Sequence, residues 1–283
     1  MPTSSIPYIN FGDTGQPVFF LHANGYPPAC YRPLLTQLAK TNRIIAMIQR
    51  PLWEGSQPEK VQDWTPLTDD LLRFLDENAS HSPIIVIGHS MGGTALLRAA
   101  LREPERFKAI VLLDPVLFPP YMTPLWYLMY NTGLGYRLHP LVATAKRRRR
   151  EFDDLDRLFK GFRRKHIFRY MGDEALQAYV EGITCKTGKG SYQLCYSAEW
   201  EARLYVTAVW RDMDIWRGLP KLRVPTLIIR GSETDTFWDG TARRMKRKQP
   251  KVRVETLEKS THLVPLERPK EVSYLIQSVL HES

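Results

Sequence analysis

The feature that most limits the fold of this chain is a series of short, continuous apolar runs that alternate with segments of helical periodicity. Such runs are typical of strands in a parallel sheet covered on both faces, and their alternation with helices predicts right-handed βαβ units. We therefore predict an α/β fold with a doubly wound, mostly parallel sheet. The expected strands cover residues 17–21, 43–48, 83–87, 108–113, 225–229 and 252–257.

The segments between these runs carry the spacing of amphipathic helices. After Ser90, the apolar residues Leu96, Leu97, Ala100 and Leu101 fall on one helical face. The same spacing recurs in 67–75 and in 272–280. These helices would cover the faces of the sheet.

The alternation stops between about residues 116 and 220, where aromatic residues and arginine are frequent. A connection of this length without secondary structure is uncommon in a compact domain, so we expect several helices and no strands there. The 283 residues would then form a core from 1–115 and 221–283, with a helical cap inserted at 116–220.

The sharpest chemical signal is the segment GHSMGG at 88–93, which follows an expected strand and opens an expected helix. This is the context of a nucleophile elbow, in which a sharp turn exposes a strained serine. Gly88 and Gly92 would leave room for neighbouring backbone. We predict Ser90 as the nucleophile and the Met91 N–H, at a helix N-terminus, as an oxyanion donor.

A serine hydroxyl needs a base and an orienting acid. We predict His262 as the base because it lies in a loop between an expected strand and the last helix. The acid should follow the preceding strand, and we prefer Asp235 there. Glu233 in the same turn remains an alternative, as does Asp114, which ends another strand at the edge where α/β sites form.

The second oxyanion donor should come from another loop at the same edge of the sheet. The segment 21–25 follows the first clear strand, and its small residues let backbone approach the serine. We predict the Asn24 N–H as this donor. Asn24-Gly25 is also an ordinary turn signal.

Together these segments resemble the α/β-hydrolase-fold superfamily over most of the chain. The order Ser90, Asp235, His262 matches the order of the family's catalytic residues, and residues 262–269 resemble its segment around the histidine. Residues 22–25 correspond to the family's His-Gly-X oxyanion segment, with Ala23 where glycine is usual. The acid turn departs from the pattern, because Asp235 lies four residues after Gly231 where three is common.

The resemblance implies a serine hydrolase that cleaves an ester or related acyl bond through an acyl-enzyme, without a metal or an organic cofactor. Aromatic residues between 118 and 130 favour an apolar or lipid-like small-molecule substrate. Acyltransferases, carbon–carbon hydrolases and cofactor-free oxygenases on this fold are alternatives, as is a non-catalytic binding protein. Haloalkane dehalogenases and related epoxide hydrolases use an aspartate nucleophile, which disagrees with Ser90. The oligomeric state stays open.

The excess of positive charge, 40 Lys and Arg against 30 Asp and Glu, lies in two patches. Residues 146–165 hold ten basic and four acidic residues, and residues 243–253 hold seven basic residues and no acidic one. A solvated helix face is the default interpretation of each patch. The run Lys146–Arg150, beside an aromatic segment, would also suit an anionic membrane surface. No nucleic-acid-binding fold accompanies either patch, so we expect no nucleic-acid partner.

The cysteines Cys30, Cys185 and Cys195 lack the spacing of a zinc site or a disulfide framework, so we expect free thiols in a reducing compartment. The first ten residues lack a signal-peptide pattern, and prolines interrupt the most apolar long stretch, 116–134. We therefore expect a cytoplasmic protein, with peripheral membrane contact as the alternative.

Overall fold

The computed structural model describes residues 5–79, 83–188 and 190–282. Within these ranges the main sheet has seven strands in the order β1-β3-β2-β4-β5-β9-β10. All neighbours are parallel except β1, which pairs antiparallel with β3. The predicted α/β fold with a mostly parallel sheet is confirmed. The strands are β1 (Tyr8–Phe11), β2 (Gln16–Leu21), β3 (Asn42–Met47), β4 (Ile84–His89), β5 (Phe107–Leu113), β9 (Thr226–Gly231) and β10 (Arg253–Leu257).

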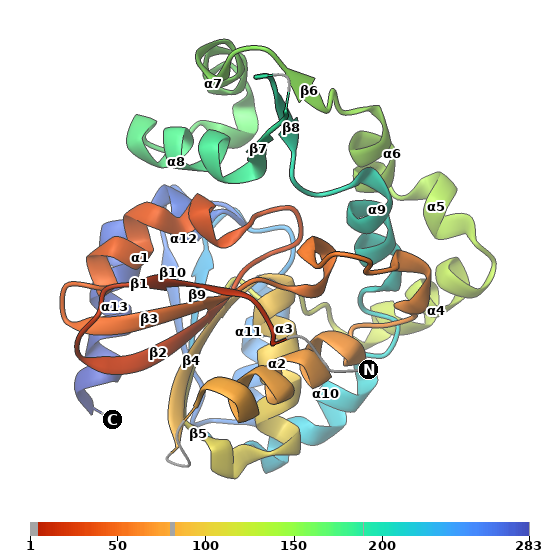
Figure 1. The fold of residues 1–283 in the computed structure, drawn as a ribbon. Helices are drawn as coiled ribbons and strands as arrows, with labels where there is room; N and C mark the ends of the chain where they lie inside the picture. Colours follow the sequence, from red (N-terminus) through yellow and green to blue (C-terminus); the bar gives the residue numbers. More distant parts are fainter. Residues whose placement is uncertain (1–4, 80–82, 189, 283) are drawn as a thin grey trace.

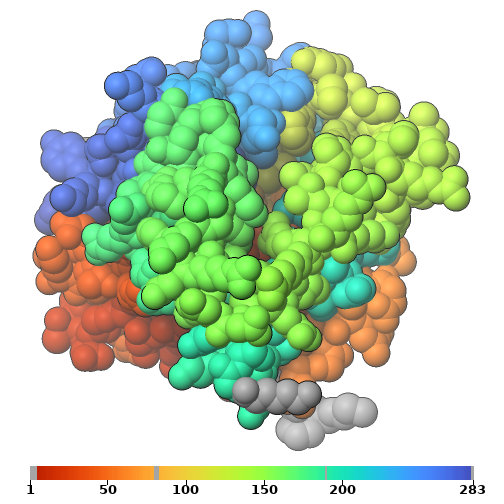
Figure 2. Space-filling view, turned by 90° about the horizontal axis from the view of Figure 1, so that it is seen from above, coloured from red at the N-terminus to blue at the C-terminus, as the bar shows by residue number. Residues whose placement is uncertain are grey.

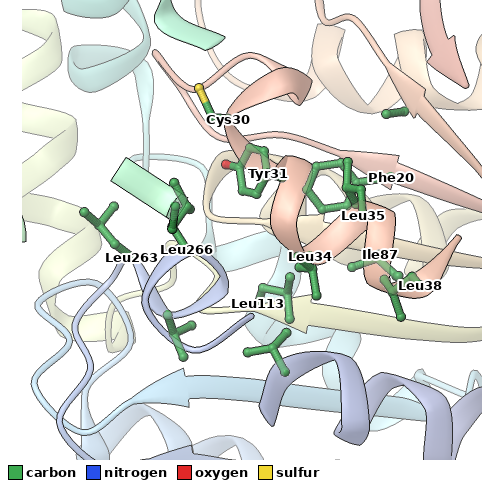
Figure 3. Close-up of a cluster of buried hydrophobic side chains, with 14 of the residues drawn as sticks. Phe20, Cys30, Tyr31, Leu34, Leu35, Leu38, Ile87, Leu113, Leu263 and Leu266 are labelled. Atoms are coloured by element: carbon green, nitrogen blue, oxygen red, sulfur yellow. The ribbon is translucent and has the colours of Figure 1, made fainter. Parts of the chain in front are cut away.

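Both faces of the central strands are buried, because successive side chains alternate between two apolar layers. In β2, Val18 and Phe20 face one layer, and Phe19 and Leu21 face the other. Figure 3 shows the first layer, where Phe20 lies beside leucines of the first helix and the same layer continues to Leu263 and Leu266. This double burial explains why the strands are continuous apolar runs.

Helices cover the two faces of the sheet (Figure 1). One layer contains α1 (Arg32–Leu38), α12 (Val264–Glu267) and α13 (Pro269–Glu282). The other contains α2 (Thr65–Asn78), α3 (Met91–Arg102), α10 (Met213–Gly218) and α11 (Asp239–Lys248). Among the residues described, none of the helices is long and apolar enough to cross a bilayer.

The strand β1 was not among the expected strands. Its four residues alternate between exposed and half-buried positions, so they do not form an apolar run. Its register, with Tyr8 opposite Met47, places it at the edge of the sheet, where burial of one face is enough.

The segment between β5 and β9 forms a layer over one end of the sheet, as Figure 1 shows. Its helices are α4 (Thr123–Asn131), α5 (Leu134–Leu138), α6 (Pro140–Arg147), α7 (Leu155–Arg163), α8 (Asp173–Ile183) and α9 (Ala198–Thr207). The expectation of helices alone is wrong, because β6 (Glu151–Phe152), β8 (Tyr192–Leu194) and β7 (Thr184–Lys186) form a small antiparallel sheet. Helix α10 falls inside the expected cap range, yet its Ile215 and Trp216 pack in the layer beside the main sheet.

The expectation of three free thiols is also wrong. Cys185 in β7 and Cys195, directly after β8, form a disulfide, and only Cys30 is free and buried among the residues described. The antiparallel pairing of β7 with β8 brings the two Cα atoms to 5.4 Å. Sequence spacing could not show this, because ten residues that form a hairpin look like any other loop.

Thiol titration tests this disulfide directly. The protein contains three cysteines, and we expect one reactive thiol in denaturant without reductant, contributed by Cys30, and three after reduction. Three thiols in the unreduced, denatured protein would contradict the disulfide.

Candidate active site

Ser90 lies at the turn between β4 and α3 in a conformation that only a constrained backbone adopts. Its φ of 56° and ψ of −120° place it in a region that ordinary side chains rarely occupy. A Cβ added to Gly88 would lie 2.6 Å from the carbonyl oxygen of Gly92, and one added to Gly92 would lie 2.7 Å from that of His22. Glycine at both positions is therefore a steric requirement of the turn, as the sequence predicts.

His262 meets Ser90 from the loop between β10 and α12. Its Nε2 lies 2.8 Å from Ser90 Oγ, within hydrogen-bond distance. The buried carboxylate of Glu267 holds this loop, because it accepts hydrogen bonds from the backbone N–H and the hydroxyl of Thr261. The structure thus brings together the predicted nucleophile and the predicted base.

Asp114, the alternative acid, is the carboxylate beside His262. It directly follows β5, is fully buried, and places Oδ2 3.5 Å from His262 Nδ1. Two hydroxyls complete the contact: Thr236 Oγ1 lies 2.8 Å from the same Nδ1, and Thr234 donates to Asp114 Oδ1 at 2.8 Å. The two threonine oxygens are 3.3 Å apart. A hydroxyl relay therefore joins Asp114 to His262 in addition to their direct contact.

The preference for Asp235 does not agree with this geometry. Asp235 is exposed in the turn after β9, and its backbone carbonyl accepts a hydrogen bond from the Trp238 indole. Glu233 in the same turn pairs with Arg169 and accepts a hydrogen bond from Tyr170 at 2.6 Å. Both acidic residues of this turn are exposed, whereas its two threonines contact Asp114 and His262.

Burial and mutual contact set the pKa values of His262 and Asp114. Burial acts to lower the pKa of His262, but Asp114 beside Nδ1, with weaker help from Asp235 and Glu267, raises it above its ordinary value of 6.5. Burial raises the pKa of Asp114, and the contact with His262 opposes that rise. Asp114 and His262 therefore stabilise each other's charged form.

The loop after β2 lies against the elbow and is fixed by buried hydrogen bonds. His22 is fully buried, and burial lowers its pKa to about 4, so it is neutral. Its Nε2 accepts from the backbone N–H of Gln49 at 3.1 Å. The Ala23 N–H donates to Tyr31, whereas the N–H groups of Asn24 and Met91 make no hydrogen bond within the described part of the chain. Their roles as oxyanion donors stay predictions.

A second chain of hydrogen bonds joins this loop to the histidine loop. The Tyr31 hydroxyl accepts from Ala23 N–H at 3.1 Å and lies 2.7 Å from His89 Nδ1. His89 Nε2 lies 2.9 Å from the carbonyl oxygen of His262. These distances require Tyr31 to donate to Nδ1 and Nε2–H to donate to the carbonyl. Burial keeps the pKa of His89 well below its ordinary value, so the ring is neutral.

The segment over the sheet contacts the same loop through Glu201 of α9. The Asn24 side chain donates to the Glu201 carbonyl at 3.1 Å. The Glu201 carboxylate is 2% exposed and lies 3.3 Å from Arg148 and 4.0 Å from Arg150. A buried acid paired with two cations thus fixes α9 and residues 148–150 above the loop.

Sequence reasoning missed Tyr31, Thr234, Thr236 and Glu201. Tyrosine and threonine in loops carry no pattern of their own, and only the fold brings these residues to the histidine. An acidic residue in a helix rich in apolar residues was a usable signal for Glu201. Within the described residues no cluster of three or more His, Cys, Asp or Glu could hold a metal ion.

The sequence model of the alpha/beta hydrolase family matches residues 18–273 of this chain. A stretch of 175 residues is 29% identical to the bifunctional epoxide hydrolase 2 of Sus scrofa, covering 58% of this chain and 30% of that protein. Over 105 residues the chain is 40% identical to a putative non-heme haloperoxidase of Mycobacterium phage D29, covering 36% of each. The chain thus matches about a third of the length of these two relatives.

Other relatives align over more of the chain. The cis-3-alkyl-4-alkyloxetan-2-one decarboxylase of Shewanella oneidensis is 26% identical, over 83% of this chain and 72% of that protein. Among solved structures, E-2-(acetamidomethylene)succinate hydrolase has a TM-score of 0.74 at 19% identity, covering 96% and 93% of the two chains. The esterase Rv0045c of Mycobacterium tuberculosis has a TM-score of 0.73 at 20% identity, covering 99% and 90%. These structural likenesses show the fold.

The pKa of the His262 imidazole tests the assignment of its acidic neighbour. In the wild-type protein, we expect NMR titration to give a pKa above 6.5, because Asp114 favours the charged ring. Asp114→Asn should lower this pKa more than Asp235→Asn, since of these two carboxylates only Asp114 contacts the ring. A larger effect of Asp235→Asn would restore the acid preferred from sequence.

Proposed function

Because the chain belongs to the alpha/beta hydrolase family, we propose that it is a serine hydrolase that cleaves ester or related acyl bonds through an acyl-enzyme. The 2.8 Å contact between Ser90 Oγ and His262 Nε2, at a strained strand-to-helix turn, carries this proposal. A hydroxyl that points at a neutral imidazole can transfer its proton while it attacks a carbonyl carbon.

In the first step Ser90 Oγ forms a bond to the acyl carbon, and its proton passes to His262 Nε2. The imidazolium then returns this proton to the leaving group as the bond between them breaks. Water repeats the sequence on the acyl-enzyme, with His262 again as the base, and releases the acid and the free serine. The buried Asp114, directly and through Thr236 and Thr234, stabilises the imidazolium in both halves.

The charge that develops on the carbonyl oxygen needs donors that do not have to reorganise. The N–H groups of Met91, at the start of α3, and of Asn24 are the candidates, since neither has another acceptor in the described residues. Each such donor is worth about 3 kcal/mol of transition-state stabilisation. The hydrogen bonds through Tyr31 and His89 join the loop that carries Asn24 to the loop that carries His262.

Replacement of the nucleophile tests the proposal. Ser90→Ala should lower kcat/KM for a short p-nitrophenyl ester by at least about a thousandfold, because the residues act as a unit and the remaining groups supply only a fraction of catalysis. Ser278→Ala, in the last helix, is the control and should keep wild-type rates. Full activity in purified Ser90→Ala would contradict the mechanism.

A further inference from the structure

A cavity of about 770 Å³ lies between α6, α7, α8 and the loop that joins α6 to α7. Tyr26, two residues after Asn24, is part of its wall and is joined to the oxyanion loop by the Tyr26 N–H to Ala23 carbonyl bond. Figure 2 shows the surface hollowed between the green and the yellow-green segments of the cap. This volume suits a small molecule.

The floor of this cavity is aromatic. Three rings surround that of Tyr179. Its centroid lies 5.7 Å from that of Phe162, 5.1 Å from that of Phe168 and 5.2 Å from that of Tyr26. All four line the cavity. Such a surface takes the apolar body of a ligand.

The rim is basic. Two of its five cations are paired with acids, Arg148 with Glu201 at 3.3 Å and Arg149 with Asp153 at 3.6 Å. Asp154, the other acid of the lining, accepts the Asp156 N–H at the start of α7. Arg147, Arg157 and Lys165 make no ion pair within the described residues. The lining therefore holds more cations than acids, and three of the cations have no acid partner there.

We propose that this cavity binds the acidic group and apolar body of the substrate, so that the enzyme prefers esters that carry a carboxylate or a similar anion. This inference rests on the proposed function for the chemistry, but the binding can be measured without turnover. The unpaired cations of the rim would contact the anion, while the aromatic floor takes the chain. A hydrogen bond from one of these cations to the anion should raise the affinity about tenfold.

Calorimetric binding to Ser90→Ala separates this inference from the catalytic one. The probes are the monomethyl half ester of adipic acid and methyl hexanoate, which share chain length and differ in charge. We expect the half ester to bind at least about tenfold more tightly. The paired substitution Arg157→Gln with Lys165→Gln should remove this advantage. Arg164→Gln, an exposed neighbour outside the cavity lining, should keep it.

Equal affinity for the two esters, or an advantage that survives the paired substitution, would overturn the inference. A clear preference for the half ester, combined with no hydrolysis of any ester by the wild-type protein, would retain the anion site and reject the proposed function. The two proposals therefore fail in different ways.

A different observation supports a second inference, about the outer face of α4, α5 and α6. Of the eleven exposed large apolar side chains among the described residues, eight lie between 121 and 141. Tyr121 is 68% exposed, Leu138 63% and Leu128 55%. In Figure 1, α4 and α5 lie at the outer edge of the molecule, and Figure 2 shows this yellow-green region projecting. A concentration of exposed apolar side chains in one segment marks an interaction surface.

The charge of this segment complements an anionic surface. Residues 115–150 contain no Asp or Glu and six Lys or Arg. Arg148 and Arg150 are turned to the buried Glu201, so the run Lys146–Arg150 does not act as one patch. Arg137 and Lys146 remain exposed beside the apolar face, with Lys146 5.6 Å from the Tyr136 ring centre. Basic, aromatic and aliphatic side chains on short helices match the interface of a bilayer with anionic lipid.

We infer that this face docks on an anionic lipid bilayer. The test is co-sedimentation with vesicles of phosphatidylcholine containing a quarter phosphatidylserine, compared with pure phosphatidylcholine. Wild-type protein should bind the anionic vesicles, and added salt should weaken this binding. Leu128→Glu with Leu138→Glu should lower the bound fraction at least about tenfold. Tyr274→Glu, 77% exposed on α13, should bind like wild type.

Wild-type protein that stays in the supernatant with anionic vesicles would overturn this second inference. Binding that is equal for neutral and anionic vesicles, or that persists in the leucine variant, would also overturn it. Because these side chains are exposed, the variant should unfold at the wild-type temperature, which a thermal melt checks.

Discussion

The close approach of backbone around Ser90 is the constraint on which the rest of the site depends. A Cβ at Gly88 would collide with the Gly92 backbone, and a Cβ at Gly92 would collide with the His22 carbonyl. Glycine at both positions lets β4, α3 and the loop after β2 pack closely together. That packing holds Ser90 at a positive φ, at a cost on the order of 1–3 kcal/mol. The two buried apolar layers of the sheet supply the stability that offsets it. In this arrangement the serine hydroxyl lies 2.8 Å from His262 Nε2.

Buried polar groups hold the loops around Ser90 in place. His22, His89 and Asp114 are fully buried, and the contacts of each belong to a loop of the site. His22 and His89 stay neutral and fix backbone, whereas Asp114 faces His262, whose pKa is raised. Similar side chains therefore take different roles because their neighbours differ. Removing any one partner would leave a buried polar group unsatisfied, which costs about 1–3 kcal/mol.

Sequence alone predicted the parallel sheet, the elbow and His262, because each depends on a local pattern. Continuous apolar runs indicate strands buried on both faces, and glycines beside a serine indicate a sharp turn. It preferred Asp235 to Asp114, and the structure disagrees; the error arose because β5 and β9 are neighbours whose ends meet at the same edge of the sheet. The conformation of the turn after β9 decides between them, and no residue spacing encodes it. Residue spacing likewise does not encode how β7 pairs with β8, so the sequence did not predict this hairpin or the disulfide between Cys185 and Cys195.

The proposed chemistry requires Ser90 to be a nucleophile activated by His262 and Asp114. Mass spectrometry of the protein after reaction with a fluorophosphonate, followed by peptide mapping, tests this most directly. We expect one adduct per chain, on the peptide that contains Ser90, and slower labelling in His262→Ala and Asp114→Asn. An adduct on another residue, or no adduct in a protein that still hydrolyses esters, would contradict it.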